Sequence, residues 1–416
     1  MTRWIDRWAA SAVERALSGL MHGRLRLETP LGKKTFGAPG GIDASMRVRD
    51  SRVFRRLLTD GEIGLGESYM DGDWSSPDLV ALARLMLRNR DAMTLPSSLS
   101  WLGTLRDRLM HRLQDNTVAG SRRNISRHYD LGNDFYRLFL DDLLLYSCAF
   151  YERSDLTLEA AQTRKLKLLC DKLSLRPGDR LLEIGTGWGG LALYAASCYG
   201  CHVTTTTISE RQYAHTRALI AKAGAESLVD LRREDYRQLE GQFDKIVSVE
   251  MFEAVGYRHY DTFFRACDRL LVPGGLLLLQ TITVDDWRFH DYRRSANWIS
   301  KHVFPGGELA SVAEVLNSAA RTTRLGLHHV QQIGTHYART LHAWRERFHR
   351  RLPDVAALGF DSRFVRTWDL YLAYCEAAFL ERHIGDVQLL MAKAGGCQVM
   401  FDEPWSNERM PHAIAV

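Results

Sequence analysis

One ten-residue run constrains this chain more than any other: Leu181-Leu182-Glu183-Ile184-Gly185-Thr186-Gly187-Trp188-Gly189-Gly190. An apolar stretch passes directly into glycines, which allow a tight turn and let a ligand approach the backbone closely. An apolar helical pattern follows at once, over residues 191–197. A strand, a glycine-rich turn and a helix in this order are typical of a ligand-binding α/β domain.

Strand and helix patterns alternate on both sides of this turn. Apolar runs of strand length cover 180–184, 202–207, 243–249 and 276–284, and helical spacing covers 158–172, 211–223 and 260–271. Strands that alternate with helices build a parallel sheet with helices on both faces. We therefore expect an α/β fold with a doubly wound, mainly parallel sheet.

The glycine spacing alone leaves more than one ligand open. Gly185, Gly187 and Gly190 satisfy the G-x-G-x-x-G fingerprint of dinucleotide enzymes. Two features oppose NAD: the acid, Glu183, precedes the glycines, and the next strand, 202–207, ends in threonines with no acid for a ribose. An acid followed by G-x-G resembles instead the class I methyltransferase fold, in which this loop lies under the amino acid end of S-adenosylmethionine. A dinucleotide enzyme and a turn without a ligand are the weaker alternatives.

Two domains are expected from the length of 416 residues and from the change of pattern along the chain. Residues 1–92 combine helical runs with short strand-like pieces and predict a smaller N-terminal α+β domain, which we expect to help dock phospholipid. Residues 93–120 contain Leu-Pro-Ser-Ser and a polar-rich helical stretch, which is typical of a linker. The catalytic domain is expected to cover residues 121–416.

The chain opens with an amphipathic helical pattern. Its apolar residues recur at spacings of three and four and therefore share one face: Trp4, Ile5, Trp8, Ala9, Ala12, Val13, Ala16, Leu17, Leu20 and Met21. Two interpretations stay open at this point. The helix either docks on a membrane surface or a partner, or it packs on its own domain.

Composition excludes several classes of protein. No apolar run reaches the roughly 18 residues of a transmembrane helix, and the opening MTRWIDRW has charges where a signal peptide has an apolar core. Seven cysteines, an odd number, indicate a reduced cytoplasmic protein, and the single C-x-x-C of Cys198 and Cys201 has no second pair with which to bind a metal. The net charge of +5 lies mostly in the N-terminal part of the chain, which suits a membrane surface or another acidic partner, but it is too small to indicate nucleic acid binding.

Several longer motifs resemble the cyclopropane-fatty-acyl-phospholipid synthases and their relatives that modify mycolic acids. The matching segments spread over roughly residues 20–395 and are 64–72 (GLGESYMDG), 128–134 (HYDLGND), 146–149 (YSCA), 187–190 (GWGG), 207–212 (TISERQ), 247–253 (VSVEMFE) and 304–307 (FPGG). Such long and chemically unusual segments do not agree by chance. The resemblance implies a S-adenosylmethionine-dependent methyltransferase that acts on a double bond of a lipid acyl chain.

The resemblance also implies which residues bind the cofactor. The cofactor contacts of the family fall on Tyr146, Ser147, Glu183, Gly185, Gly187, Gly189, Thr207, Ser209, Gln212, Asp235 and Tyr236. Asp235 and Tyr236 follow the third strand, where such enzymes hold the adenine. The substrate implied is an unsaturated phospholipid, reached by a cytoplasmic enzyme at the inner face of the membrane, and members of the family commonly form homodimers.

The base of the family's reaction is a bound bicarbonate ion. Its cage falls on Cys148, Glu253, Gln280, Ile282 and Tyr337. An alkene is a poor nucleophile, so it must meet the sulfonium methyl group in a dry site. Methyl transfer leaves a carbocation on the chain, and a base must then remove a proton so that a cyclopropane ring closes.

Three departures from the family pattern concern this last step. Gln280 replaces the common histidine of the cage, Ala254 replaces the histidine that often follows Glu253, and Thr186 stands within the glycine loop where the family has cysteine. A Gln amide can donate a hydrogen bond to bicarbonate but cannot change charge. The alternative products are a methylene branch, or a methyl branch after a later reduction, and a lipid-binding relative without catalysis is the non-enzyme alternative.

Cys375 falls where the family has a cysteine that is a candidate nucleophile. It lies on an apolar helical pattern with Tyr371, Leu372 and Phe379. A buried thiol without a basic neighbour is inert, so this pattern favours a core residue over a catalytic one.

Overall fold

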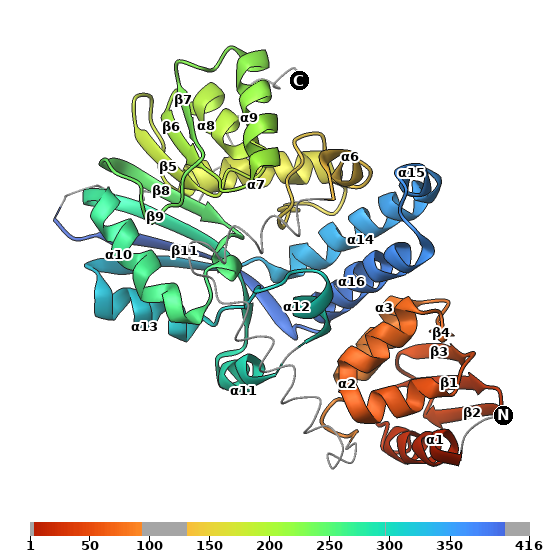
Figure 1. Cartoon of the computed structure of the whole chain (residues 1–416). Helices are drawn as coiled ribbons and strands as arrows, with labels where there is room; N and C mark the ends of the chain where they lie inside the picture. The colour runs from red at the N-terminus through yellow and green to blue at the C-terminus, as the bar shows by residue number, and fades with distance from the viewer. Residues whose placement is uncertain (1–3, 94–130, 296, 396–416) are drawn as a thin grey trace. The chain divides into compact units, whose positions relative to one another are not determined.

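The fold comes from a computed structural model, which describes residues 4–93, 131–295 and 297–395 (Figure 1). The chain divides into two compact units. The first unit takes Met1–Gln114, His290–Pro305 and Tyr337–Ile384, and the second takes the three segments between and after these. The predicted linker, residues 93–120, lies almost wholly outside the described residues.

A seven-stranded sheet forms the centre of the second unit. Its strands follow the order β10-β11-β9-β8-β5-β6-β7, with bounds β5 Arg180–Ile184, β6 His202–Thr206, β7 Val229–Arg232, β8 Phe243–Val249, β9 Leu271–Val284, β10 Leu325–Gln332 and β11 Ile384–Lys393. Strands β9, β8, β5, β6 and β7 run parallel, whereas β10 and β11 pair antiparallel. The mainly parallel α/β sheet expected from the sequence is confirmed.

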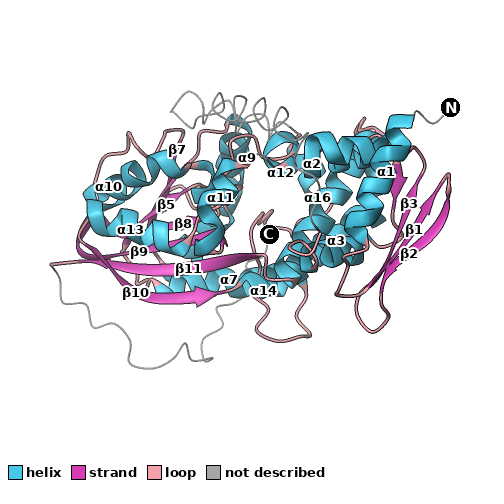
Figure 2. Cartoon of the chain, turned by 90° about the horizontal axis from the view of Figure 1, so that it is seen from below, coloured by secondary structure: helices cyan, strands magenta, loops and turns pink. Residues whose placement is uncertain are grey.

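Helices cover both faces of this sheet (Figures 1 and 2). Their bounds are α6 Asn133–Tyr136, α7 Leu158–Lys172, α8 Gly190–Tyr199, α9 Glu210–Ala223, α10 Tyr260–Leu270 and α13 Val312–Thr322, with short 3₁₀ turns at Phe252–Ala254, Tyr257–His259 and Asp286–Arg288. Alternate residues of a strand point to opposite faces, so Leu277 and Leu279 join one core cluster and Leu276 and Leu278 the other.

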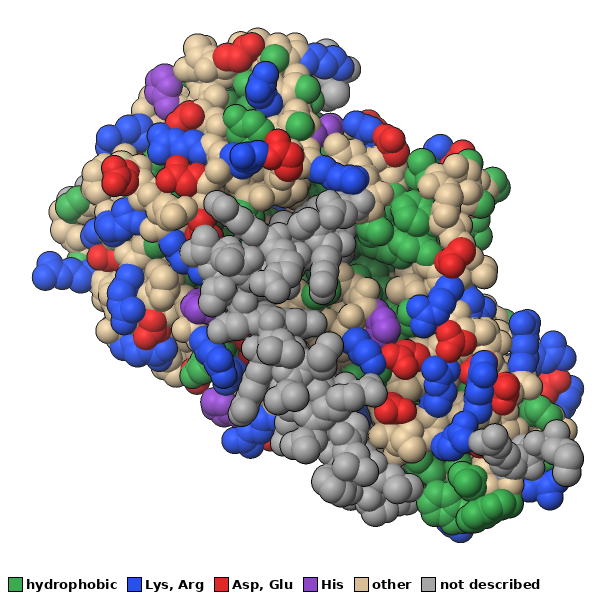
Figure 3. Space-filling model, in the orientation of Figure 1, with side chains coloured by type: hydrophobic (Ala, Val, Ile, Leu, Met, Phe, Trp, Pro, Cys, Tyr) green, Lys and Arg blue, Asp and Glu red, His purple; other side chains and the backbone are tan. Residues whose placement is uncertain are grey.

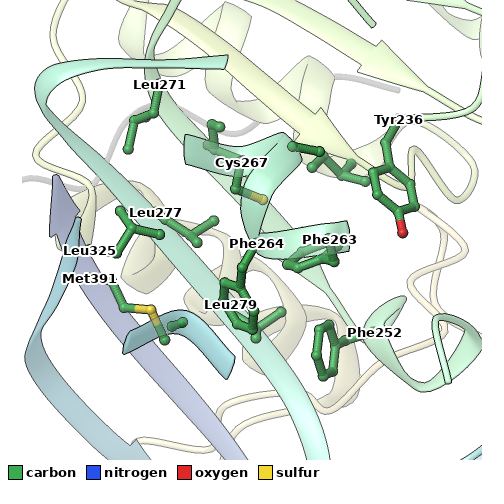
Figure 4. Close-up of a cluster of buried hydrophobic side chains, with 14 of the residues drawn as sticks. Tyr236, Phe252, Phe263, Phe264, Cys267, Leu271, Leu277, Leu279, Leu325 and Met391 are labelled. Atoms are coloured by element: carbon green, nitrogen blue, oxygen red, sulfur yellow. The ribbon is translucent and has the colours of Figure 1, made fainter. Parts of the chain in front are cut away.

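The two clusters show what holds each layer to the sheet. The first is rich in aromatic rings, and Figure 4 shows Phe252, Phe263 and Phe264 gathered with Leu277 and Leu279. The Phe252 ring lies 5.0 Å from the Phe263 ring in an edge-on arrangement, which is favourable for aromatic pairs. The second cluster takes side chains from α7, α8 and α9.

The first unit has its own four-stranded sheet, in the order β2-β1-β3-β4. Its strands are β1 Arg24–Thr29, β2 Gly32–Gly37, β3 Asp43–Val48 and β4 Trp74–Ser75, and its helices are α1 Trp4–Leu17, α2 Arg52–Met70, α3 Leu79–Arg88, α12 Trp298–His302, α15 Leu352–Ala357 and α16 Ser362–Leu380. The helices α11 Phe289–Arg294 and α14 Gly334–Arg350 begin in segments of the second unit and lie mostly in the first.

The first unit therefore includes chain that the sequence analysis assigned to the catalytic domain. Helix α16 packs on α2 and α3. The Tyr69 hydroxyl donates to Asp369 Oδ2 at 2.8 Å, and the Arg366 guanidinium donates to the Trp74 carbonyl at 2.6 Å. These polar contacts and a shared apolar core, which includes Ala373 and Ala377, join α16 to the N-terminal sheet and helices.

The GLGESYMDG motif explains how another distant segment joins this unit. Gly66 on α2 faces the indole of Trp298, and a Cβ at position 66 would lie 2.4 Å from Trp298 Cδ1. The next residue, Glu67, pairs with Lys301 at 2.7 Å and with His302 at 3.0 Å. The motif thus fixes α12 onto α2 within the first unit.

Helix α1 is buried along part of its apolar stripe and exposed at its N-terminal end. Ala9, Val13 and Leu17 are buried in the core of the first unit, whereas Trp4 is 76% and Trp8 47% exposed. Figure 3 shows hydrophobic side chains on the surface at this end of the chain. Among the described residues, no helix is both long enough and apolar enough to cross a membrane.

Candidate functional site

The glycine loop lies at the carboxyl end of β5. Gly185, Gly187 and Gly189 have φ angles of 101°, 54° and 92°, in the region that favours glycine. The backbone N–H groups of Gly185 and Thr186 donate to the Thr206 carbonyl at 3.2 and 2.9 Å, which fixes the turn against β6.

The loop has the open space that a ligand against its backbone requires. A Cβ at Gly187 would meet no heavy atom within 4 Å, whereas a Cβ at Gly189 would lie 2.8 Å from Thr216 Cγ2. Thr186 Oγ1 is buried and has no hydrogen-bond partner. Gly189 is therefore needed for packing, and Gly187 and Thr186 leave a cradle and a polar atom for a ligand. These features fit S-adenosylmethionine at the place where the sequence predicted it.

Glu183, the acid before the loop, is buried in the middle of the sheet. It accepts a hydrogen bond from Thr205 Oγ1 at 2.5 Å, on the neighbouring strand β6. Burial raises the pKa of Glu183 to about 8, although the Thr205 hydrogen bond opposes the shift. A carboxyl group with this pKa holds its proton at neutral pH and can therefore donate as well as accept.

Thr207, Ser209 and Gln212 form one hydrogen-bonded unit at the end of β6. Thr207 Oγ1 donates to Gln212 Oε1 at 2.9 Å and accepts from the Ser209 backbone N–H at 3.1 Å. Ser209 Oγ accepts from the Gln212 N–H at 3.3 Å and so caps α9. These side chains build the start of α9 beside the glycine loop, and their contact with a cofactor stays a prediction.

Asp235 and Tyr236 follow β7. Both carboxylate oxygens of Asp235 pair with the Arg237 guanidinium, at 2.8 and 2.7 Å. The Tyr236 ring packs edge-on against Phe263 at 5.5 Å, and Figure 4 shows it at the border of the aromatic cluster. Arg237 is thus a charged neighbour of the predicted adenine site that the sequence analysis did not name.

Tyr146, Ser147 and Cys148 lie on a segment without regular secondary structure. The Tyr146 ring is 5.4 Å from Tyr136. Ser147 Oγ accepts a hydrogen bond from Lys165 Nζ at 2.6 Å, and Lys165 is buried on α7. Burial lowers the pKa of Lys165, while the nearby acids, Glu250 first among them, oppose this shift.

The Cys148 backbone and the Gln280 side chain both donate to the carboxylate of Glu250, which the sequence analysis did not name as a site residue. Glu250 Oε1 accepts from the Cys148 N–H and from Gln280 Nε2, both at 2.8 Å. Gln280 Nε2 also donates to Asp386 Oδ2 at 3.2 Å, and Gln280 Oε1 accepts from Gln388 Nε2 at 2.9 Å. The Gln280 amide is fully buried and uses both of its N–H groups within the protein.

Further buried groups hold this network in place. Lys172 Nζ donates to Gln388 Oε1 and to Gln331 Oε1, both at 2.6 Å. Burial lowers the pKa of Lys172 to about 7. Asp386 is fully buried, and burial together with the charges of Glu250 and Glu253 raises its pKa well above its ordinary value.

Glu253 lies on the short turn after β8. Its Oε1 accepts from the Ile282 N–H at 2.6 Å and from Thr281 Oγ1 at 2.9 Å. Its Oε2 is buried and has no hydrogen-bond partner. Burial, and next the charge of Glu250, raise the pKa of Glu253 to about 7. Glu253 and Ile282 are therefore brought together, as the sequence predicted.

Tyr337 and Cys375 belong to the first compact unit. The Tyr337 ring stacks on Phe379 with ring centroids 4.5 Å apart. Cys375 is buried, and burial raises the pKa of its thiol to about 12. A thiol of this kind is a weak nucleophile, which suits the core role favoured by the sequence pattern.

The residues of the second unit share one edge of the sheet. The glycine loop, the Thr207 turn, Asp235, Glu250 and Glu253 all follow the carboxyl ends of strands. Ligands of open α/β sheets bind at that edge. Sequence reasoning missed Glu250, although it lies three residues before Glu253 in a quoted motif, and missed Asp386 and Gln388, which come from the last described strand.

Comparison with known proteins identifies the family. Residues 117–389 match the family described as mycolic acid cyclopropane synthetase. A tuberculostearic acid methyltransferase of Mycobacterium tuberculosis is 37% identical over 94% of this chain and 96% of its own length. A cyclopropane-fatty-acyl-phospholipid synthase of Escherichia coli is 39% identical over 84% of this chain and 87% of its own.

Solved structures agree with this assignment. The cyclopropane synthase MmaA2 of M. tuberculosis has a TM-score of 0.61 and 33% identity, and the match covers 65% of this chain and 98% of that one. The mycolic acid cyclopropane synthase CmaA1, solved with S-adenosylhomocysteine and CTAB, gives the same TM-score, identity and coverage. The chain belongs to the mycolic acid cyclopropane synthetase family and is an S-adenosylmethionine-dependent methyltransferase that modifies fatty acyl chains.

Proposed function

We propose that this enzyme transfers the methyl group of S-adenosylmethionine to the cis double bond of an unsaturated phospholipid acyl chain and closes a cyclopropane ring. The observation that carries this proposal is the pair of carboxylates after β8, Glu250 and Glu253, on the strand next to the glycine loop. Negative charge at this place stabilises a carbocation that forms beside a methyl donor.

S-adenosylmethionine supplies an electrophilic methyl group when it is bound. The residues that would hold it are the glycine loop around Gly187, the Thr207–Gln212 turn and the Asp235–Tyr236 segment. The open space at Gly187 and the unpartnered Thr186 Oγ1 support this assignment. The chain's own contribution is to orient the donor, exclude water and stabilise positive charge.

The carbocation has two outcomes that differ in bonding and not in mass. Loss of a proton from the transferred methyl group, with its C–H electron pair attacking the cationic carbon, gives a cyclopropane ring. A hydride shift from the methyl-bearing carbon to the cationic carbon, followed by the same proton loss, gives a methylene branch. The branch is the second candidate, because the relative matched over 94% of this chain is named a tuberculostearic acid methyltransferase.

Bicarbonate, the base expected from the resemblance, does not fit the donors that the second unit offers. The Cys148 N–H and Gln280 Nε2 already donate to Glu250, and the Ile282 N–H donates to Glu253. A bicarbonate ion in the same place would have to displace two carboxylates from their hydrogen bonds. We therefore draw no step through bicarbonate.

The exposed part of α1 supports a place for the enzyme at the cytoplasmic membrane surface. Trp4, Ile5 and Trp8 are exposed on one end of a helix whose other apolar residues are buried. Exposed tryptophans favour the boundary between headgroups and acyl chains. We propose that this end of α1 contacts the lipid that carries the substrate.

The proposed function is tested by incubating the purified full chain with S-adenosylmethionine and vesicles of a cis-unsaturated phosphatidylglycerol. Mass spectrometry should show the acyl chain gaining the mass of one methylene group. Proton NMR of the product should then show the strongly shielded protons of a cyclopropane ring. Vinylidene protons in their place would establish the methylene branch, and unchanged lipid with tight cofactor binding would refute both.

A further inference from the structure

Glu250 accepts hydrogen bonds from two of the residues that the resemblance gives to the bicarbonate cage. The resemblance places two members of the bicarbonate cage at Cys148 and Gln280, and each offers a hydrogen-bond donor, the Cys148 N–H and Gln280 Nε2. Here both groups donate to one oxygen, Glu250 Oε1, and each distance is 2.8 Å. A carboxylate and a bicarbonate ion present the same planar pair of oxygens to such donors. The side chain therefore supplies from within the protein what bicarbonate supplies from solution.

The backbone at Glu250 is held in a conformation that serves this placement. Its φ angle is 47°, which an ordinary side chain rarely adopts. The Glu250 N–H donates to the Gln280 carbonyl at 2.8 Å, so the residue is fixed to β9 directly after β8 ends. Unfavourable backbone conformations of this kind persist where the surrounding structure needs the side chain in one place.

Buried titratable groups lie next to Glu250. Asp386 is fully buried and shares the Gln280 amide with Glu250, and burial together with the charges of the neighbouring acids raises its pKa well above its ordinary value. Of two carboxyl groups so close together, one keeps the proton and leaves the other charged. Lys165 is buried on α7, and its electrostatic interaction with Glu250 opposes the lowering of the Lys165 pKa by burial. Glu250 is only partly buried.

We infer that the Glu250 carboxylate is the base that removes the proton from the transferred methyl group, in place of bicarbonate. This inference rests on the proposed function. The carboxylate takes the proton, and the C–H electron pair forms the new carbon–carbon bond, either to the cationic carbon as a ring or, after a hydride shift, as a double bond. The neutral Glu250 then returns the proton to solvent. A carbocation makes its neighbouring C–H groups strongly acidic, so a weak base is sufficient.

Glu253 has a different part in the same site. Its Oε1 is tied to the Ile282 N–H and Thr281 Oγ1, and its Oε2 is buried away from solvent. It does not contact the Cys148 or Gln280 donors. Its charge can stabilise the cation, but it does not hold the place of the anion.

The test compares wild type with Glu250→Gln and Glu250→Gly, and uses the solvent-exposed Glu226→Gln as a matched control. Each full-length protein is assayed with S-adenosylmethionine and unsaturated phosphatidylglycerol vesicles in buffer purged of carbon dioxide and in buffer with added bicarbonate. Circular dichroism and a S-adenosylmethionine titration establish folding. Glycine is tolerated at this positive φ. If the glycine variant does not fold, the comparison of Glu250→Gln with wild type is sufficient.

We expect wild type and Glu226→Gln to be equally active with and without bicarbonate. Glu250→Gln should lose roughly 10²-fold or more of the rate, as expected when a general base is removed. Its residual product should include alcohols or isomeric alkenes, which form when the cation is not deprotonated at the transferred methyl group. Glu250→Gly frees both donors and leaves a space, so bicarbonate should restore part of its rate. Wild-type activity that disappears on removal of carbon dioxide, or a wild-type rate in Glu250→Gln, would overturn the inference. A wild-type enzyme that binds the cofactor but makes no modified lipid would instead refute the proposed function.

Discussion

Replacing Glu253 by glutamine should make the stability of the protein respond differently to pH. The side chain has a raised pKa of about 7 in the fold, against an ordinary value of 4.5, because it is buried beside Glu250. An acid with a raised pKa holds its proton more tightly in the folded state, so its presence lowers stability as pH rises above 4.5, with the full cost above pH 7. Glutamine does not titrate, so the variant lacks this cost.

The magnitude follows from the two pKa values. Between pH 5 and pH 8 the ionisation of Glu253 should cost the wild-type fold about 2.5 kcal/mol, at 1.36 kcal/mol per pKa unit. The new amide also places a donor at the unpartnered Oε2 position, which costs about 1–3 kcal/mol but does not depend on pH. The robust prediction is therefore the change in the stability difference between the two pH values, rather than its value at either one.

The assay is urea unfolding of wild type, Glu253→Gln and the exposed Glu226→Gln at pH 5, 6.5 and 8. The free energy of unfolding of Glu253→Gln, relative to wild type, should rise by about 2.5 kcal/mol from pH 5 to pH 8. Glu226→Gln should show no such trend. A constant difference between wild type and Glu253→Gln across this range would refute the argument that burial raises the Glu253 pKa.

Four further predictions concern the site, the first unit and the membrane. Glu253→Gln should lose roughly 5- to 150-fold in single-turnover methyl transfer, if the cost of about 1–3 kcal/mol for the unmatched donor of the new amide falls on the transition state. Cofactor affinity should change little; equal losses in rate and affinity would place the damage at the cofactor site. Gly187→Asp should abolish S-adenosylmethionine binding in calorimetry while the fold survives, because a side chain and a negative charge enter the open cradle; unchanged affinity would contradict this. Gly66→Ala should lower the free energy of unfolding by about 1–3 kcal/mol, because its Cβ would lie 2.4 Å from Trp298 Cδ1, and a concurrent Trp298→Ala should remove that clash; an unaltered urea midpoint in Gly66→Ala would show that α12 moves freely. Trp4→Ala with Trp8→Ala should weaken binding to anionic vesicles and leave the melting temperature nearly unchanged, whereas a large drop in melting temperature with intact vesicle binding would assign these residues to the core.

The elements with a strong local pattern could be predicted from the sequence. The helix at Leu158–Lys172 and the strands at Arg180–Ile184 and Phe243–Val249 have the predicted bounds. The short strand Val229–Arg232 and the edge strand Leu325–Gln332 were not given bounds, because the first has four residues and the second is largely exposed. Such strands depend on their neighbours in the sheet more than on their own composition.

Long-range pairing limited the prediction of the domains and the site. Nothing local in α16 indicates that it packs with α2 and α3 rather than with the catalytic sheet, since an apolar helix face fits either. Asp386 reaches Gln280 across 106 positions of sequence, and only the sheet order brings the two together. Glu250 could have been found, because a second acid three residues before Glu253 in a strand-end motif is a visible signal.

The most direct test of the proposed reaction follows the hydrogens of the transferred methyl group. The wild-type enzyme is given S-adenosylmethionine with a trideuterated methyl group and an unsaturated phosphatidylglycerol, and the acyl chain is analysed by mass spectrometry and deuterium NMR. Two of the three deuterium atoms should remain on the added carbon, because a base removes one from the cation. Retention of all three deuterium atoms would contradict methyl transfer followed by proton loss from that carbon.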